Sequence, residues 1–220
     1  AWRKPFVKEG GRGIAQDCQD DYIPGLAFSL LELDQRQAAV DRLAELVEEA
    51  NFHFTPDLMS NGLLLPTLAS NERADITYRL LMQDTVSSWL YQVNREAKTT
   101  WETWEEYDKK GNAVMSHNYY AFGTVVQRLQ EGVAGMSPVA AGWWRIKIRP
   151  YVGGGLLYTA ACVDTPLGMV KSFWKLIEST DQVELEVVVP IYSSAQVMLG
   201  DQRVEGVRSG LHKFVCKVNL

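Results

Sequence analysis

Apolar side chains recur every three or four residues through much of the first 137 positions, which is the spacing of one helix face. The clearest stripe comprises four apolar residues, Val40, Leu43, Val47 and Ala50. Asp34 precedes this stripe and is suited to cap the helix. Gln37 stands where the partner of a capping box would stand. The pattern therefore predicts a helix that begins after Asp34.

Further helical segments are predicted on both sides of this stripe. Apolar spacing indicates helices near residues 26–31, 63–68 and 73–82, and Pro24 suits the first turn of the earliest one. A last stripe runs through residues 119–133. Because only short polar links separate these segments, we expect antiparallel helical hairpins.

Beyond Pro138 the period of the pattern changes to two. Residues 145–149, 183–187 and 213–218 alternate between apolar and polar side chains. Such alternation places one face of each strand on a core and the other in water, which is typical of antiparallel sheets. The sequence therefore predicts antiparallel strands after residue 138.

The turn residues agree with that prediction. Thr165-Pro166-Leu167-Gly168 has proline and glycine where a hairpin turn needs them. Gly153-Gly154-Gly155 lies between strand candidates and no helix follows it, which argues against a phosphate-binding loop. The expected fold is α+β with segregated elements: a helical domain at 1–137 and an antiparallel β-sandwich at 138–220. This order disfavours a nucleotide-binding doubly wound sheet.

Composition narrows the range of partners. The net charge of −5 over 220 residues argues against nucleic acid, and no apolar run reaches the length of a membrane span. Cys18, Cys162 and Cys216 are far apart and form no CxxC pair, so no zinc site, other metal site or cofactor is predicted. We expect them to be small core residues, in a reducing, cytoplasmic compartment. The first residue is not methionine, so we expect a longer parent protein.

Aromatic and acidic side chains concentrate between Trp89 and Phe122. Within this segment Trp101 and Trp104 flank Glu102. Hydrolysis of a glycosidic bond uses two carboxyl groups, one as acid and one as base. Glu102 suits one of these roles, and the two indoles could form the apolar walls of a sugar subsite.

The same segment has a purely structural interpretation. In it the two tryptophans pack a helix end and Glu102 faces water, because clusters of this kind are only probabilistic indicators of a site. His117 and Asn118 could bind sugar hydroxyls or could simply belong to a loop. A solvated face is expected for three neighbouring acidic residues, Glu105, Glu106 and Asp108.

Taken together, these stretches resemble bacterial α-L-rhamnosidases of glycoside hydrolase family 78. That family has Pro-Ser-Trp, then Gly-Ala-Thr-Thr-x-Trp-Glu-x-Trp, then Ser-x-Asn-His-Tyr-Ala-Phe-Gly. This chain has counterparts at 87–89, 96–104 and 116–123. Other segments match the family in the same order, so that the resemblance covers nearly the whole chain: 17–22, 73–81, 132–135, 148–150, 153–156, 165–168 and the strand around Trp174.

The resemblance implies a six-hairpin (α/α) barrel, of which this chain holds the last helices, followed by a small β-sandwich. It also implies inverting hydrolysis of terminal α-linked L-rhamnose, with Glu102 as the general base. The general acid of the family lies far upstream of this segment, outside the chain. The substrate-binding residues implied are Trp89, Trp101, Trp104, His117, Asn118 and Tyr119.

Some positions depart from the family pattern. The histidine that contacts the sugar in the family is Tyr119 here, and His117 stands two places earlier. The Gly-Ala-Thr-Thr stretch becomes Glu96-Ala97-Lys98-Thr99. Because a pocket with different hydrogen-bond donors discriminates differently, these changes bear on which sugar is bound and on whether activity is retained.

Three functions stay open on these grounds. The first is a fragment of a glycoside hydrolase that carries the base, lacks the acid and binds a rhamnose-containing carbohydrate. The second is a non-catalytic protein of the same fold that binds carbohydrate or a partner. The third is another barrel enzyme such as a uronate lyase, which should have more basic residues near Glu102 than Arg95 and Lys98.

The length of the helical region bears on assembly. Twelve helices of about 11–12 residues do not fit before residue 138. A partial barrel leaves apolar surface exposed, so self-association through the exposed barrel helices is expected.

Overall fold

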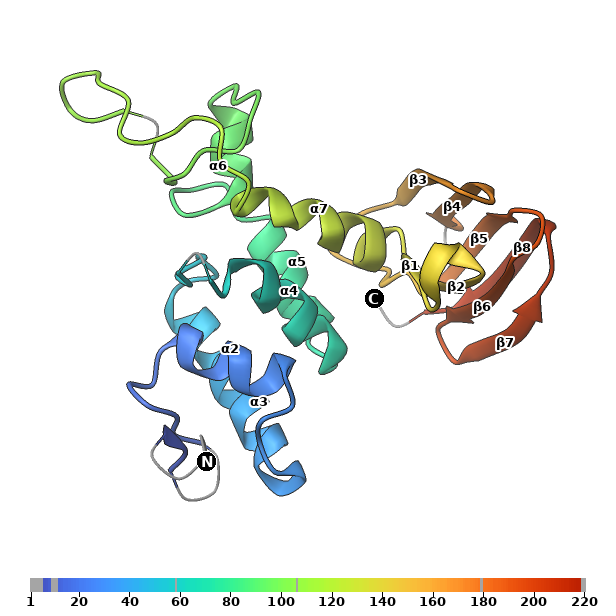
Figure 1. Cartoon of the computed structure of the whole chain (residues 1–220), viewed down its shortest axis with the longest axis horizontal. Helices are drawn as coiled ribbons and strands as arrows, with labels where there is room; N and C mark the ends of the chain where they lie inside the picture. Colours follow the sequence, from blue (N-terminus) through green and yellow to red (C-terminus); the bar gives the residue numbers. More distant parts are fainter. Residues whose placement is uncertain (1–5, 9–11, 58, 106, 179, 219–220) are drawn as a thin grey trace. The chain divides into compact units, whose positions relative to one another are not determined.

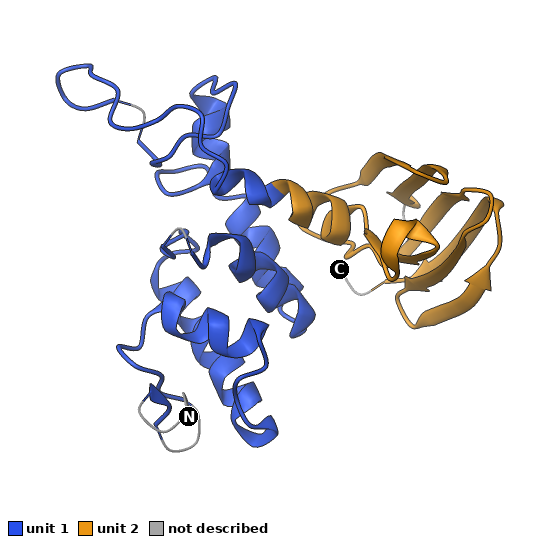
Figure 2. Cartoon of the chain, in the orientation of Figure 1, with its two compact units in different colours: residues 1–125 blue, residues 126–220 orange. Residues whose placement is uncertain are grey.

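The computed structural model describes residues 6–8, 12–57, 59–105, 107–178 and 180–218. The chain forms two compact units, Ala1–Val125 and Val126–Leu220 (Figure 2). The long helices lie in the first unit and the named strands of the described residues in the second. The predicted order, helices first and strands afterwards, is therefore confirmed.

Among the described residues, five α-helices build the first unit (Figure 1). They are α2 (Gln19–Ala27), α3 (Leu33–Glu49), α4 (Asn61–Ser70), α5 (Ala74–Leu81) and α6 (Trp89–Asn94). Helix α2 packs on α3 and on α4, and α4 packs on α5. Their apolar faces meet in one core that includes Tyr22, Leu43 and Leu64, all fully buried. The predicted helices near 63–68 and 73–82 correspond to α4 and α5.

Two predicted helix starts are wrong by a few residues. Helix α3 begins at Leu33, where the side chain of Gln35 accepts a hydrogen bond from the amide of Glu32 at 3.3 Å. Asp34 lies in the first turn instead of capping it, where its charge still complements the helix dipole. Helix α2 begins at Gln19, so Pro24 lies inside the helix.

The last predicted stripe also starts too early. Helical turns begin only at Phe122, as a 3₁₀ turn (Phe122–Thr124), then α7 (Val125–Arg128), then a π-helical turn (Leu129–Val133). Tyr119 is not helical because its amide donates to the carbonyl of Thr100 at 2.8 Å. Helix α6 was not predicted, since six residues are too few to show a period.

In the described part of the second unit, eight strands form two four-stranded sheets. One sheet has the order β1 (Met136–Pro138), β2 (Arg145–Ile148), β6 (Ser194–Leu199), β7 (Gln202–Val207). The other has the order β3 (Tyr158–Thr165), β4 (Gly168–Leu176), β5 (Gln182–Val189), β8 (Gly210–Lys217). The three alternating stretches of the sequence correspond to β2, β5 and β8. Thr165 pairs with Gly168 across the predicted hairpin turn.

The expectation of purely antiparallel strands is wrong for one sheet. Strands β2 and β6 pair in parallel, with Ile146 beside Ala195 and Ile148 beside Val197, so this sheet is mixed. Alternation reports which face of a strand is buried and says nothing of the direction of its neighbour. The second sheet is antiparallel throughout.

The helical turns before β1 are hydrogen-bonded to β4 of the antiparallel sheet. The indole N–H of Trp174 donates to the carbonyl of Val133 at 2.8 Å, and the hydroxyl of Ser172 donates to that of Ala134 at 2.7 Å. Gly135 then turns the chain at a φ of +80°, and a Cβ there would lie 2.2 Å from the nitrogen of Pro150. The contacts explain why Val126–Val133 belongs to the second unit.

The prediction that the three cysteines are core residues is wrong. Cys18 and Cys162 are exposed and Cys216 is half-buried. Cys162 lies at one of the exposed positions of β3, which alternate with half-buried ones. No helix in the described ranges is both long enough and apolar enough to cross a membrane.

Candidate functional site

Helix α6 fixes the backbone on both sides of Glu102. Its first turn is capped by Ser88, whose hydroxyl oxygen accepts from the amide of Tyr91 at 3.2 Å. Gln92 is buried and points at the segment around Glu102. Its side-chain oxygen accepts from the amide of Trp101 at 3.4 Å, and its nitrogen donates to the carbonyl of Thr103 at 3.3 Å.

A second segment pairs irregularly with the first. The amide of Glu102 donates to the carbonyl of Ser116 at 2.8 Å, and the threonine hydroxyls also take part. Thr99 donates to the carbonyl of His117, and Thr100 donates to that of Tyr119. These bonds bring three sequence-predicted residues, Glu102, His117 and Tyr119, into one loop pair. The sequence did not predict the hydrogen bonds of Gln92, Thr99 and Thr100. The two consecutive threonines of the 96–104 stretch were the available signal.

The carboxylate of Glu102 is held on one side only. Its Oε2 accepts a hydrogen bond from the amide of Ser116 at 3.2 Å. Among the described residues, no hydrogen bond to Oε1 is recorded. The side chain is half-buried. One oxygen is thus oriented by the backbone, and the other is left to accept a proton from water or a hydroxyl.

Two of the predicted binding residues lie in an aromatic core. Trp89 is 8% exposed, and its indole N–H donates to the carbonyl of Phe122 at 2.8 Å. Trp104 stacks on Phe122 with ring centroids 3.8 Å apart and packs edge-on against Trp89 at 5.5 Å. Phe54 completes the cluster. In this structure Trp89 and Trp104 pack in the core next to the Glu102 segment.

The other predicted binding residues lie on or beside the loop pair and differ in burial. Trp101 is 3% exposed, and its ring lies 5.6 Å from that of half-buried His117. The ring of His117 also packs edge-on with that of Tyr107, with centroids 5.4 Å apart. Asn118 is exposed, and its amide donates to the hydroxyl of Ser116 at 3.2 Å. Tyr119 is half-buried and packs against Tyr120.

A short hairpin follows the candidate site. Tyr107 and Ala113 form an antiparallel bridge, and Asp108 organises the turn between them. The side chain of Asn112 and the amides of Lys110 and Asn112 donate to the Asp108 carboxylate. The Asn112 side-chain bond, together with these amides, holds the pKa of Asp108 below its usual value. Glu105 is exposed as expected, and Glu106 lies outside the described residues.

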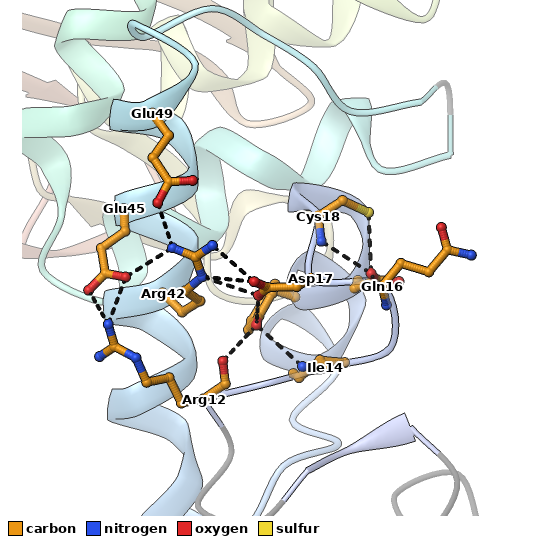
Figure 3. Close-up of polar contacts among 10 residues, drawn as sticks. Arg12, Ile14, Gln16, Asp17, Cys18, Arg42, Glu45 and Glu49 are labelled. Carbon is orange, nitrogen blue, oxygen red and sulfur yellow. Dashed lines mark hydrogen bonds and ion pairs between the residues drawn. The ribbon is translucent and has the colours of Figure 1, made fainter.

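A charged cluster lies elsewhere in the helical unit and was not predicted (Figure 3). Arg42 bonds Asp17 at 2.9 Å, Glu45 at 3.1 Å and Glu49 at 2.7 Å. The hydrogen bond from Arg42, followed by that from Tyr22, lowers the pKa of Asp17. The cluster ties the segment before α2 to α3.

No group of three or more histidine, cysteine or acidic side chains among the described residues is arranged to hold a metal ion. The chemistry available at this loop pair is that of an oriented carboxylate beside aromatic rings and amide groups. An oriented carboxylate with one unpaired oxygen is suited to general-base catalysis.

Comparison with known proteins identifies the family. The model of the bacterial α-L-rhamnosidase 6 hairpin glycosidase domain matches residues 1–133. The chain belongs to the bacterial α-L-rhamnosidase family. The model of the family's C-terminal domain matches residues 135–213. The rhamnosidase match therefore covers both the helical region and the sheets.

Individual rhamnosidases agree with this result. An α-L-rhamnosidase of Formosa agariphila is 31% identical over 224 residues, and the match covers all of this chain and 24% of that protein. The structure of the Aspergillus terreus α-L-rhamnosidase superposes with a TM-score of 0.90 at 31% identity, over 97% of this chain and 25% of that one.

A third relative is a structure of the Streptomyces avermitilis α-L-rhamnosidase in complex with L-rhamnose. It superposes with a TM-score of 0.90 at 28% identity, over 98% of this chain and 23% of that one. The chain thus spans about a quarter of the length of these relatives.

Proposed function

We propose that this chain is part of an inverting α-L-rhamnosidase and that Glu102 is its general base. In this reaction a carboxylate removes a proton from water as the water attacks the anomeric carbon of a terminal rhamnose. The glycosidic bond breaks on the opposite face, where a carboxylic acid protonates the leaving oxygen. That acid is proposed to lie outside these 220 residues.

The geometry of Glu102 supports the proposal most directly. A general base needs a free oxygen within hydrogen-bond reach of the proton that it removes. Oε1 is unpaired among the described residues, while the amide of Ser116 orients the carboxylate through Oε2. His117, Asn118 and Tyr119 lie on the same segment as Ser116, where they are proposed to bind the hydroxyls of the sugar.

The tryptophans are assigned two different roles. Trp101 is proposed to border the rhamnose subsite through its contact with His117. Trp89 is buried and half-buried Trp104 packs against it, which supports an indirect role in which both keep the Glu102 segment in place. The proposed domains are the last part of a six-hairpin (α/α) barrel at 1–137 and a β-sandwich at 138–220.

The proposal is tested by hydrolysis of an aryl α-L-rhamnoside with the full-length protein. Proton NMR of the first product formed should detect β-L-rhamnose, because a single displacement inverts the anomeric centre. Initial release of α-L-rhamnose would contradict the inverting mechanism. Binding of rhamnose without any turnover would instead support a non-catalytic carbohydrate-binding protein.

The missing acid is tested with this chain alone. One carboxylate cannot act as base and protonate the leaving group in the same step. The isolated 220 residues should therefore give no turnover above background, although the full-length protein is active. Robust hydrolysis by the isolated chain would contradict the assignment of the acid to another part of the protein.

We also propose that the isolated chain self-associates through its helical unit. Large apolar side chains are exposed there, including Leu33 at 91% and Met59 at 89%. Exposed apolar surface favours association when it is large enough. Light scattering coupled to gel filtration should show oligomers whose fraction rises with concentration, and a monodisperse monomer would contradict this.

A further inference from the structure

A cleft of about 570 Å³ opens between α6 and the hairpin that follows Glu102. This volume lies within the range of roughly 300–1,000 Å³ that is usual for small-molecule sites. The side chains that the argument uses are Tyr91, Arg95, Glu105, Tyr107, Asp108 and Lys109. None of them was assigned a binding role above.

Two cations of the cleft have no ion-pair partner among the described residues. Neither Arg95 nor Lys109 takes part in a recorded ion pair. Arg95 lies over the ring of Tyr91, with 5.3 Å from the guanidinium carbon to the ring centroid, and donates to its hydroxyl at 3.3 Å. These contacts restrain the guanidinium beside the cleft and leave donors for a planar carboxylate.

The acidic side chains of the cleft restrict the ligand further. The carboxylate of Asp108 already accepts hydrogen bonds from Lys110 and Asn112 within its turn. The side chain of Glu105 has no hydrogen-bond or ion-pair partner among the described residues. Both would repel a multiply charged anion such as a phosphate group. A ligand with one carboxylate and several hydroxyls fits better, because Glu105 can then accept a hydrogen bond from a hydroxyl. Tyr91 and Tyr107 offer apolar ring faces beside these groups.

The cleft is connected to the candidate base through one ring contact and one hydrogen bond. Tyr107 lines the cleft and packs on His117, which follows Ser116, the partner of Glu102. In an inverting glycosidase the base lies on the face of the sugar opposite the leaving group. A terminal rhamnose carries no further sugar on its own hydroxyls, so a cleft beside the base is placed for a segment of the glycan remote from the bond that is cleaved.

We infer that this cleft is an accessory subsite for a uronic acid residue of an acidic glycan, with Arg95 and Lys109 holding the carboxylate. The inference rests on the proposed function only for the expectation that the ligand is a glycan. It adds a charged determinant of substrate choice that the rhamnose site itself does not contain.

The probe is a trimer of galacturonic acid, which contains no rhamnose, titrated into the full-length protein by calorimetry. Its carboxyl-reduced counterpart serves as the neutral ligand. We expect the acidic trimer to bind at least about tenfold more tightly, and this preference to fall with added salt. Equal affinity for the two trimers would overturn the inference.

Four variants, one of them a control, locate the binding. Arg95→Gln and Lys109→Gln should each lower the affinity for the acidic trimer. For Arg95→Gln we expect a loss of about tenfold, which is the scale of one charge-assisted hydrogen bond. Lys110→Gln is the matched control, because Lys110 is the neighbouring lysine and does not line the cleft. Glu105→Gln should tighten binding, since it removes the nearest free negative charge. Equal losses in Lys109→Gln and Lys110→Gln would overturn the inference.

Two readouts separate this subsite from the proposed activity. Added L-rhamnose should not displace the acidic trimer if the subsite is distinct, and competitive displacement would overturn the inference. Hydrolysis of an aryl rhamnoside is measured separately. A protein that binds the acidic trimer through Arg95 and hydrolyses no rhamnoside would disprove the proposed function and leave the subsite standing.

Discussion

The two units each contain a buried tryptophan that donates to a backbone carbonyl at 2.8 Å. Trp89 donates to Phe122 in the helical unit, and Trp174 donates to Val133 in the β unit. Trp174 lies in a strand whose own backbone groups are satisfied by β3 and β5. The backbone around Glu102, next to Trp89, is irregular, and its groups are hydrogen-bonded by the side chains of Gln92, Thr99 and Thr100.

This difference shows where the protein is sensitive to single changes. In the sheets the ladder supplies the hydrogen bonds, so the side chains are free to fill a core or to face water. In the segment around Glu102 individual side chains replace a ladder, and loss of one leaves buried groups unpaired. A site that needs an unusual backbone can be built in such a segment, at the cost of lower tolerance to substitution.

The largest expected effect concerns Glu102 in the full-length protein. Glu102→Gln keeps the size of the side chain and removes the proton acceptor. We expect kcat to fall by about 10²–10⁴-fold with little change in binding of rhamnose, as for a group used mainly in the transition state. Glu178→Gln, at an exposed position of the β unit, is the control. Equal activity of the two variants would remove Glu102 from the mechanism.

The next largest effect concerns the core of the β unit. Trp174→Ala creates a cavity and leaves the carbonyl of Val133 without its donor. We expect a loss of about 3–5 kcal/mol in the free energy of unfolding of that unit, measured by urea denaturation. Trp144→Ala is the matched control, because Trp144 is 58% exposed. A similar loss in both variants would show that burial of Trp174 does not specifically stabilise the β unit.

A third test addresses the irregular segment directly. Gln92→Ala leaves the amide of Trp101 and the carbonyl of Thr103 without their partner. We expect about 1–3 kcal/mol of destabilisation, together with lower activity, because the backbone around Glu102 loses its support. Gln37→Ala, at an exposed position of α3, should change neither quantity. Unchanged activity in Gln92→Ala would show that α6 does not position the base.

The smallest effect is a pH dependence of the charged cluster. Arg42, and after it Tyr22, lower the pKa of Asp17 in the folded chain. The carboxylate therefore stabilises the fold above its unfolded pKa of about 3.9, and this contribution disappears as the pH falls through the lower folded value. Asp17→Asn should cost less than about 1 kcal/mol at pH 7, because the side chain is 38% exposed and solvent screens the pair.

The comparison of wild type and Asp17→Asn is made by thermal unfolding at pH 7 and below pH 3. The two proteins should differ at neutral pH and converge in acid. A difference that persists or grows in acid would show that the hydrogen bonds of Asp17, and not its charge, carry the effect.

The sequence alone determined the class of each region. The change of period near Pro138 predicted helices before strands, because burial of one face imposes the periodicity of the element on its apolar residues. It also determined the family, since the order of short motifs around Glu102 and Trp174 depends only on the chain. The positions of β2, β5 and β8 followed from alternation.

The tertiary structure decided what periodicity cannot encode. The parallel pairing of β2 with β6 depends on which strand lies next to which, and alternation is the same for either direction. The start of the last helical segment at Phe122 depends on the bond between Tyr119 and Thr100, which are far apart in sequence. The partners of Gln92, the packing of Trp89 against Trp104 and the cleft beside Arg95 likewise arise only when distant segments meet. Side-chain contacts of this kind have no fixed spacing along the chain, so only the folded chain specifies them.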